Sequence, residues 1–257
     1  MTTPTSAPTT RACPRCGRPL PTFTIPGLRG RGEITLHGQC DCEAAEERAE
    51  RRMERAAQLE SAWKATGVPM EYRGVEPDRD TLSSLDLDAG NGLYVYGSRG
   101  TGKTTMACRV LKAYVATHTG GQGWCSARFV SAPAWLDRMR DAYDRRGASA
   151  EEEFERASRT AFLVLDDVGK FPSRVTDWAV GKLFRLVDER CSERRPTVFT
   201  SKYSPSALYG RLVEGGDPDT AGDVVSRIRL RCRMVPCSGE DMRLRISKQS
   251  RDVPVSH

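Results

Sequence analysis

The sequence predicts an α/β fold in which a parallel β-sheet lies between helices, preceded by a small cysteine-rich segment and a charged helix. Over residues 67–250, short apolar runs typical of buried strands alternate with stretches whose apolar residues recur at helical spacing. A glycine-rich loop joins one such strand to one such helix. Four of the nine cysteines fall within residues 11–42, where frequent glycine and proline prevent the segment from burying a core of its own.

Composition narrows the class of protein. The chain has 257 residues, of which 38% are hydrophobic and 29% charged, as is typical of a globular protein. No apolar run approaches the roughly 20 residues of a membrane-spanning helix. Residues 1–10 are expected to form a disordered tail without signal-peptide features, and residues 251–257 a second tail. We therefore expect a cytoplasmic protein that makes no membrane contact, and its net charge of +6 permits nucleic-acid binding without requiring it.

Residues 11–42 are predicted to hold a metal. Cys13 and Cys16 form a Cys-x-x-Cys pair followed by glycine, a turn typical of zinc knuckles. Cys40 and Cys42 supply a second close pair, so that four thiolates can surround one structural Zn²⁺. His37 lies three residues before Cys40, and a site of three cysteines and one histidine is the alternative. The other cysteines have no comparable spacing and are expected to pack in the core.

Residues 43–66 predict a solvated linker helix, because strong helix formers carry interleaved charges up to Gly67 and Pro69. A helix that docks a partner is the alternative. Beyond it, strands are expected at residues 93–96, 128–130, 162–165 and 197–200, with a further strand or hairpin from 233–236 and 242–246. Helices are expected at residues 106–115, 133–145 and 180–191. The glycine- and acid-rich residues 214–223 predict a mobile loop.

The glycine-rich loop matches the pattern Gly-x-x-x-x-Gly-Lys-Thr of phosphate-binding loops. Its glycines let successive backbone N–H groups face an anion, and the helix that follows adds partial positive charge at its N-terminus. Lys103 is expected to face the β- and γ-phosphates, and the hydroxyl of Thr104 to bind Mg²⁺. The predicted nucleotide-binding residues are Gly97, Ser98, Arg99, Gly100, Thr101, Gly102, Lys103, Thr104 and Thr105.

An acidic pair completes the predicted site. Asp166 and Asp167 directly follow the apolar run 162–165, where a buried strand should end. A strand-end aspartate holds the Mg²⁺ shell in P-loop enzymes, so we assign that role to Asp166. Asp167 is expected to orient or activate the attacking water.

Several ordered motifs then resemble one family. Residues 65–74, 97–104, 163–169 and 194–203 are similar, in that order, to the AAA+ ATPases of the DnaC/DnaI-type helicase loader and IstB-like transposition helper group. The resemblance covers roughly residues 65–248, and the cysteine-bearing N-terminus resembles that of phage or mobile-element members. It implies a P-loop AAA+ core over residues 67–250, ATP and Mg²⁺ as cofactors, hydrolysis of ATP to ADP and phosphate, and a homo-oligomer in the ATP state.

The resemblance also implies roles for individual residues. Arg227 stands in a segment that presents an arginine finger in the family, and Arg243 in one that carries a second sensing arginine. Arginines alternate from residue 227 to 233, so a basic, DNA-contacting face is the alternative reading of Arg227. Lys202 occupies a sensor position where the family usually has asparagine. Thr200 or Ser201 is then expected to take the sensor role, or hydrolysis is expected to be slow.

The expected function is the loading of a replicative helicase hexamer onto single-stranded DNA. A transposition helper ATPase and a nucleotide-gated DNA-binding adaptor with negligible turnover are the alternatives. By analogy with helicase loaders, the cysteine module is expected to dock the helicase. DNA contact is the other possibility for this module, because it carries five basic residues against few acidic ones: Arg11, Arg15, Arg18, Arg29 and Arg31.

Overall fold

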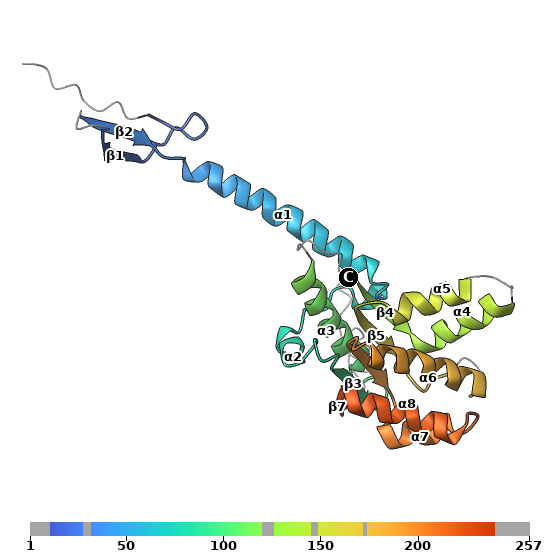
Figure 1. The fold of residues 1–257 in the computed structure, drawn as a ribbon. Coiled ribbons are helices and arrows are strands. Elements are labelled where there is room, and N and C mark those ends of the chain that lie inside the picture. Colours follow the sequence, from blue (N-terminus) through green and yellow to red (C-terminus); the bar gives the residue numbers. More distant parts are fainter. Residues whose placement is uncertain (1–10, 28–31, 120–125, 145–148, 172–173, 240–257) are drawn as a thin grey trace, which may run out of the picture. The chain divides into compact units, whose positions relative to one another are not determined.

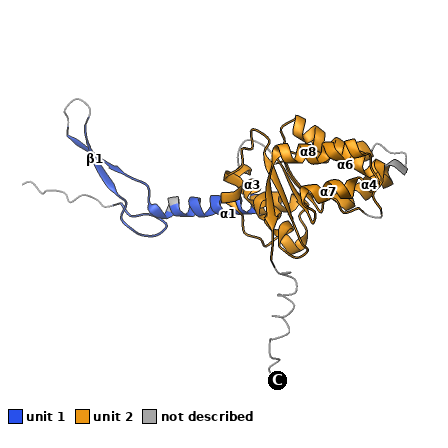
Figure 2. Ribbon diagram, turned by 90° about the horizontal axis from the view of Figure 1, so that it is seen from below, with its two compact units in different colours: residues 1–58 blue, residues 59–257 orange. Residues whose placement is uncertain are grey.

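The computed structural model describes residues 11–27, 32–119, 126–144, 149–171 and 174–239 (Figure 1). The chain divides into two compact units, an N-terminal unit of residues 1–58 and a C-terminal unit of residues 59–257 (Figure 2). Helix α1 (Asp41–Ala65) begins in the first unit and ends in the second. Within the described ranges, no helix combines the length and the apolar character needed to cross a lipid bilayer.

The N-terminal unit is built on an antiparallel hairpin of strands β1 (Thr22–Pro26) and β2 (Glu33–His37). Among the described residues of this unit, only Cys13 and Cys40 are buried. A two-stranded hairpin without a core is marginally stable in water. The described residues of this unit therefore bury little that could stabilise it, and a metal cross-link between its segments remains the expectation from the sequence.

The C-terminal unit holds a five-stranded sheet in which every neighbouring pair is parallel and the strand order is β4-β5-β6-β3-β7. The strands are β3 (Gly92–Gly97), β4 (Ala127–Ser131), β5 (Phe162–Asp166), β6 (Thr197–Ser201) and β7 (Cys232–Cys237). The predicted α/β fold, with a parallel sheet between helices, is confirmed. The unit begins at Leu59 rather than at residue 67, because Trp63 and Thr66 are already buried in its core.

Successive residues of each strand point to opposite faces of the sheet and build two separate cores. Leu93, Val95 and Val164 pack against α3 (Lys103–His118), together with α2 (Arg79–Ser83) and the end of α1. Tyr94 and Leu165 pack on the other face. That face is covered by α4 (Ala132–Asp144), α5 (Ser149–Ser158), α6 (Asp177–Ser192), α7 (Pro205–Leu212) and α8 (Pro218–Arg231), as Figure 1 shows. Both faces are apolar, which explains why the strands read as continuous apolar runs.

The prediction of a loop over residues 214–223 is wrong in its second half. Helix α8 begins at Pro218, and the Asp217 carboxylate caps it by accepting a hydrogen bond from the Thr220 N–H at 2.8 Å. Proline at the first helical position and aspartate before it are helix-start signals that the loop-like composition concealed. The alternating arginines also do not form one strand face, since Arg227, Arg229 and Arg231 lie on this helix.

Candidate nucleotide-binding site and cysteine cluster

The predicted phosphate-loop residues and the two aspartates meet at one edge of the sheet. Because all five strands are parallel, their carboxyl ends share an edge, and Gly97, Asp166 and Ser201 are the last residues of β3, β5 and β6. Thr104 joins them from the first turn of α3, which follows the phosphate loop. Ligands of open α/β sheets bind outside this edge.

Three glycines allow the backbone conformation of the phosphate loop. Gly100 and Gly102 have φ angles of 74° and 81°, in the left-handed region that favours glycine. A Cβ at Gly97 would lie 1.9 Å from the carbonyl oxygen of Cys237 in β7, so the loop starts where two strands approach too closely for a side chain. Lys103 is buried, and its Nζ donates to the Ser98 carbonyl at 2.6 Å across the loop.

Asp166 is the centre of a compact hydrogen-bond network. Its Oδ1 accepts from the Thr104 hydroxyl at 2.9 Å and from the Thr200 hydroxyl at 2.5 Å. Burial raises the pKa of Asp166, and the Thr200 hydrogen bond opposes that rise. A carboxylate beside a hydroxyl is the donor set that Mg²⁺ takes in P-loop enzymes, so Thr104 and Asp166 fit the predicted metal role.

Asp167 has an unusual backbone held in place by the neighbouring strand. Its φ is 61°, a left-handed conformation that is rare outside glycine and tends to occur at functional sites. The Asp167 N–H donates to the Thr200 hydroxyl oxygen at 3.0 Å. Its carboxylate accepts from Lys170 Nζ at 3.1 Å, and both side chains line the cleft described below. Thr200 thus links the two aspartates through a single fully buried hydroxyl.

Ser201, the second candidate for the sensor role beside Thr200, differs from the neighbouring Lys202 in what it can reach. The Ser201 hydroxyl is buried, donates to the Val168 carbonyl at 2.6 Å and accepts from the Tyr203 N–H at 3.1 Å. Lys202 lines the cleft, and its Nζ lies 4.7 Å from the centre of the Tyr203 ring. Ser201 therefore shapes the turn after β6, while Lys202 presents a cation to the cleft.

A cavity of about 820 Å³ extends from the phosphate loop along the sheet edge. Eight of the predicted residues line it: Arg99, Gly100, Gly102, Lys103, Thr104, Thr105, Asp166 and Asp167. The cavity also has lining residues that the sequence reasoning missed: Pro69, Glu71, Tyr72, Val75, Phe129, Ser131, Lys170, Tyr203 and Arg211. Ser131 was within reach of prediction, because it ends a parallel strand at the same edge as Asp166.

Arg227 is not among the residues that line this cavity. It lies on α8, where its Nε pairs with the Asp188 carboxylate of α6 at 2.6 Å and its guanidinium lies 4.9 Å from the centre of the Phe184 ring. A second, longer ion pair joins it to Asp223 at 3.5 Å. Arg243 falls outside the described residues.

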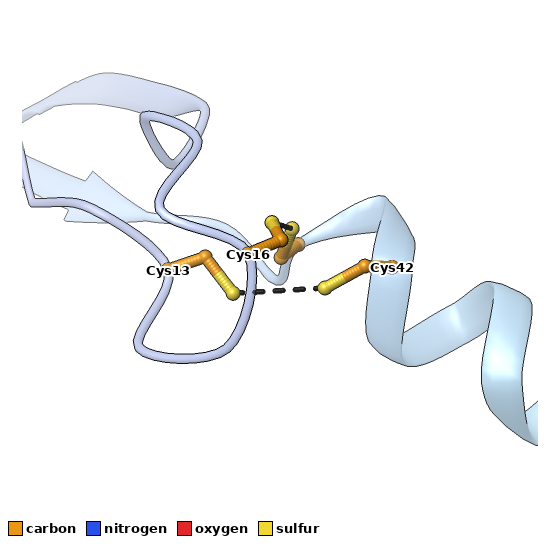
Figure 3. A group of neighbouring side chains, drawn as sticks. Cys13, Cys16 and Cys42 are labelled. Atoms are coloured by element: carbon orange, nitrogen blue, oxygen red, sulfur yellow. Dashed lines mark hydrogen bonds between the residues drawn. The ribbon is translucent and has the colours of Figure 1, made fainter.

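The four cysteines of the N-terminal unit converge (Figure 3). All four sulfur atoms lie within 4.8 Å of one another, with Cys13 Sγ 3.6 Å from Cys42 Sγ and Cys16 Sγ 3.4 Å from Cys40 Sγ. Tetrahedral zinc with Zn–S bonds of about 2.3 Å sets its sulfurs about 3.8 Å apart, so the cluster fits one such ion.

The turn that carries the first pair is shaped for thiolates. Gly17 has a φ of 71° and donates its N–H to the Cys13 carbonyl at 2.9 Å, which closes a tight turn. The backbone N–H groups of Cys16 and Arg15 lower the pKa of the Cys13 thiol to about 7. His37 is exposed in β2 and is not part of the sulfur cluster. The arrangement favours four cysteines over three cysteines and His37.

The fold and the cleft define a P-loop protein of the AAA+ class. Residues 40–250 match the family described as IstB-like ATP binding protein, and because this match takes in most of the chain, the chain belongs to that family. The family is one of P-loop ATPases, in agreement with the expected nucleotide chemistry. The resemblance inferred from the ordered motifs is confirmed.

The individual relatives that match include helicase loaders, and the chain spans less than half the length of the curated relative. The chain is 30% identical over 131 residues to the replicative helicase loader DnaI of Bacillus subtilis (strain 168), a match that covers 50% of this chain and 39% of that protein. Two solved structures share the fold. The DnaC helicase loader matches with a TM-score of 0.53 and 22% identity over 66% of this chain and all of that one. A DnaI structure matches with a TM-score of 0.55 and 18% identity over 66% of this chain and 95% of that one.

Proposed function

We propose that this protein is an ATP-driven loader that places a replicative helicase hexamer on single-stranded DNA in the cytoplasm. The observation that carries the proposal is the similarity to the DnaI loader, combined with a cleft whose residues suit ATP and Mg²⁺. ATP binding favours a homo-oligomer, and hydrolysis releases or resets it.

The cleft supports phosphate binding through charge and backbone geometry. Lys103 lies against the loop and supplies a positive charge for the β- and γ-phosphates, while the N-terminus of α3 adds its partial charge. Mg²⁺ would be held by Thr104 and Asp166 and would neutralise charge that develops on the phosphoryl group. The contact between these two side chains is already made at 2.9 Å, so the pair requires little rearrangement.

Hydrolysis needs a group that orients water, and Asp167 is the best placed. Its carboxylate lines the cleft one residue beyond Asp166, and its backbone is fixed by Thr200. Thr200 acts through the two aspartates, and the buried Ser201 supports the turn behind them. Lys202 would contribute a positive charge at the sensor position but no acceptor for a water proton.

Arg227 is proposed to act in a neighbouring copy of the chain as an arginine finger. Its absence from the lining of its own cleft is what a finger acting in trans requires. Its ion pairs with Asp188 and Asp223 would hold the side chain ready on the surface between α6 and α8. Arg243 is proposed as a second sensing arginine on the family resemblance alone.

We propose that one Zn²⁺ is held by Cys13, Cys16, Cys40 and Cys42 and acts as a structural cross-link. The ion would join the turn at residues 13–17 to the start of α1, and so supply stability to a unit in which only two of the described residues, Cys13 and Cys40, are buried.

The N-terminal unit is proposed to dock the helicase through one face of its hairpin. Phe23 pairs with Leu36 and Ile25 with Ile34, so all four side chains lie on the same face. Each is between 43% and 59% exposed. An exposed apolar face of this kind is typical of a protein-binding surface.

Two other functions have support of their own. The family match favours a transposition helper ATPase that binds duplex DNA and a transposase. Lys202 at the sensor position favours a nucleotide-gated DNA-binding adaptor with negligible turnover. A capture experiment separates the helicase loader from the transposition helper. The tagged full-length protein, with ATP present, is mixed with the replicative helicase and the transposase of the same genome. We expect retention of the helicase, and retention of the transposase alone would contradict the proposal.

A further inference from the structure

One wall of the cleft is a short irregular segment. Pro69, Tyr72 and Val75 line the cavity from this segment, which contains a single turn of 3-10 helix, η2 (Met70–Tyr72). Backbone hydrogen bonds within it span three residues, such as that from the Tyr72 N–H to the Pro69 carbonyl at 3.0 Å. So short a turn has little stability of its own, and its position depends on contacts from outside the segment.

Two side chains from different helices donate hydrogen bonds to backbone carbonyl oxygens of this segment, which we call the wall of the cleft. Lys112 of α3 donates from Nζ to the Val75 carbonyl at 2.7 Å and to the Arg73 carbonyl at 3.4 Å. Trp63 of α1 donates from its indole N–H to the same Arg73 carbonyl at 3.0 Å. Lys112 Nζ also lies 5.7 Å from the centre of the Trp63 ring, within reach of a cation–π contact.

Lys112 belongs to the same helix that carries the phosphate-binding residues. Helix α3 begins with Lys103 and Thr104, and Lys112 lies further along the same helix. Arg109, between them, donates from Nε to the Glu76 carbonyl at 3.2 Å. One rigid helix therefore sets the position of the wall relative to the phosphate loop.

The wall has the chemistry of a base site. Three of the four residues that line the cavity from this segment, Pro69, Tyr72 and Val75, have apolar or aromatic side chains, and the fourth is Glu71; Phe129 of β4 adds an aromatic ring to the lining. The flat, weakly polar part of a nucleotide is its base, whereas the phosphates require the cations and N–H groups of the loop. We infer that Lys112 is a positioning residue that fixes the base-binding wall at the right place for a nucleotide whose phosphates lie on the loop. The inference rests on the proposed binding of ATP.

A ligand without a base distinguishes this role from a general effect on the fold. Inorganic tripolyphosphate with Mg²⁺ needs the phosphate loop and not the wall. We expect Lys112→Met to raise the Kd for ATP about tenfold, equivalent to about 1.4 kcal/mol, and to leave the Kd for tripolyphosphate unchanged. In turnover assays the same variant should raise KM and leave kcat near its original value, since the catalytic groups are untouched.

Matched variants sharpen the comparison. Lys112→Arg keeps a cationic donor and should restore most of the ATP affinity. Lys64→Met removes an exposed lysine of α1 that pairs only with Glu60 among the described ion pairs, and should change neither Kd. Trp63→Phe keeps an aromatic ring, although a smaller one, and removes the N–H donor to the Arg73 carbonyl, so it should weaken ATP binding selectively and by a smaller factor than Lys112→Met.

The outcomes separate the inference from the proposed function. If Lys112→Met binds ATP as tightly as the original protein, or loses ATP and tripolyphosphate equally, Lys112 does not position the wall. If circular dichroism shows that Lys112→Met does not fold, the Kd values of Trp63→Phe for ATP and for tripolyphosphate provide the test instead. A failure of the unaltered chain to bind ATP at all would overturn the proposed function, and the inference with it.

Discussion

Replacing Thr200 by valine removes one hydroxyl from the centre of the site without changing its shape. The Thr200 side chain is fully buried, and valine has nearly the same volume, so no cavity should form. The hydroxyl donates to Asp166 Oδ1 at 2.5 Å and accepts the Asp167 N–H at 3.0 Å. Thr200→Val therefore breaks the link between both aspartates and β6.

The expected cost follows from these two contacts. An Asp167 N–H that loses its part-buried contact with Thr200 costs at most about 1–3 kcal/mol, and a hydrogen bond to a charged group contributes about 1.5–3 kcal/mol. Because Asp166 retains its contact with Thr104, we expect a total loss of about 2–4 kcal/mol in the free energy of unfolding, a large fraction of the ~5–15 kcal/mol of a typical domain. Thr200→Ser keeps the hydroxyl and should lose only about 1 kcal/mol for the missing methyl group.

The loss should depend on pH in a defined direction. Burial already raises the pKa of Asp166 in the folded protein, and the Thr200 hydroxyl opposes that shift. Without the hydroxyl the folded-state pKa rises further above that of the unfolded chain. A carboxyl group whose pKa is higher in the folded than in the unfolded protein stabilises the fold fully at pH values below its unfolded-state pKa. This stabilisation is lost as the pH rises through the folded-state pKa. The difference between Thr200→Val and the original protein should thus widen as pH rises.

Urea unfolding at several pH values, with Thr200→Ser as the control, measures this effect. ATP turnover of the same samples should fall about tenfold to a hundredfold in Thr200→Val, because small displacements of catalytic groups are costly. A Thr200→Val protein as stable and as active as Thr200→Ser would refute the account of Thr200 as the link between the aspartates.

Three further outcomes are expected. Asp167→Asn should keep ATP bound and stall turnover, as measured by nucleotide binding and phosphate release; an active variant would move the water-orienting role elsewhere. Cys40→Ser should lose zinc, with metal analysis of the original protein giving about one Zn²⁺ per chain; a variant that keeps its full zinc and its fold would make His37 the next candidate ligand. Arg227→Ala should bind ATP and hydrolyse it poorly alone, and addition of Lys103→Ala protein should partly restore turnover. If mixing never restores activity and Arg227→Ala loses only DNA affinity, Arg227 contacts the DNA backbone.

Local patterns predicted the parts of the site that lie next to one another in the sequence. The phosphate loop needs glycines, lysine and threonine at fixed spacing between a strand and a helix, and such a pattern is visible in a single chain. Asp166 was predictable because a strand-end carboxylate is common in proteins with this loop. The two cysteine pairs were likewise apparent from spacing alone.

Contacts between distant segments were not predictable in the same way. Arg190 is 1% exposed and donates to the carbonyls of Ala157, Ser158, Thr160 and Pro196 and to the Thr197 hydroxyl. Nothing in the helical pattern of residues 180–191 distinguishes it from a surface arginine, because its partners come from other elements. Lys112 and Lys170 escaped prediction for the same reason.

Helices α7 and α8 were not predicted from the sequence, and a loop was expected over residues 214–223. Helix α7 begins at Pro205 after the cap Ser204, which accepts from the Ala207 N–H, and α8 begins at Pro218 after Asp217. In both, the capping residue and the proline give a start signal, while glycines nearby suggest a turn. Burial of Leu208 and Val224 in the core stabilises helices whose intrinsic propensity is modest.

The central claim is that ATP bound in this cleft drives the loading of a helicase. The most direct measurement counts the helicase hexamers that the purified protein transfers to circular single-stranded DNA, with ATP and without nucleotide. The account predicts transfer that depends on ATP and is lost in Lys103→Ala, whose cleft lacks the cation for the phosphates. Equal transfer by Lys103→Ala, or none by the unaltered protein with ATP, would contradict it.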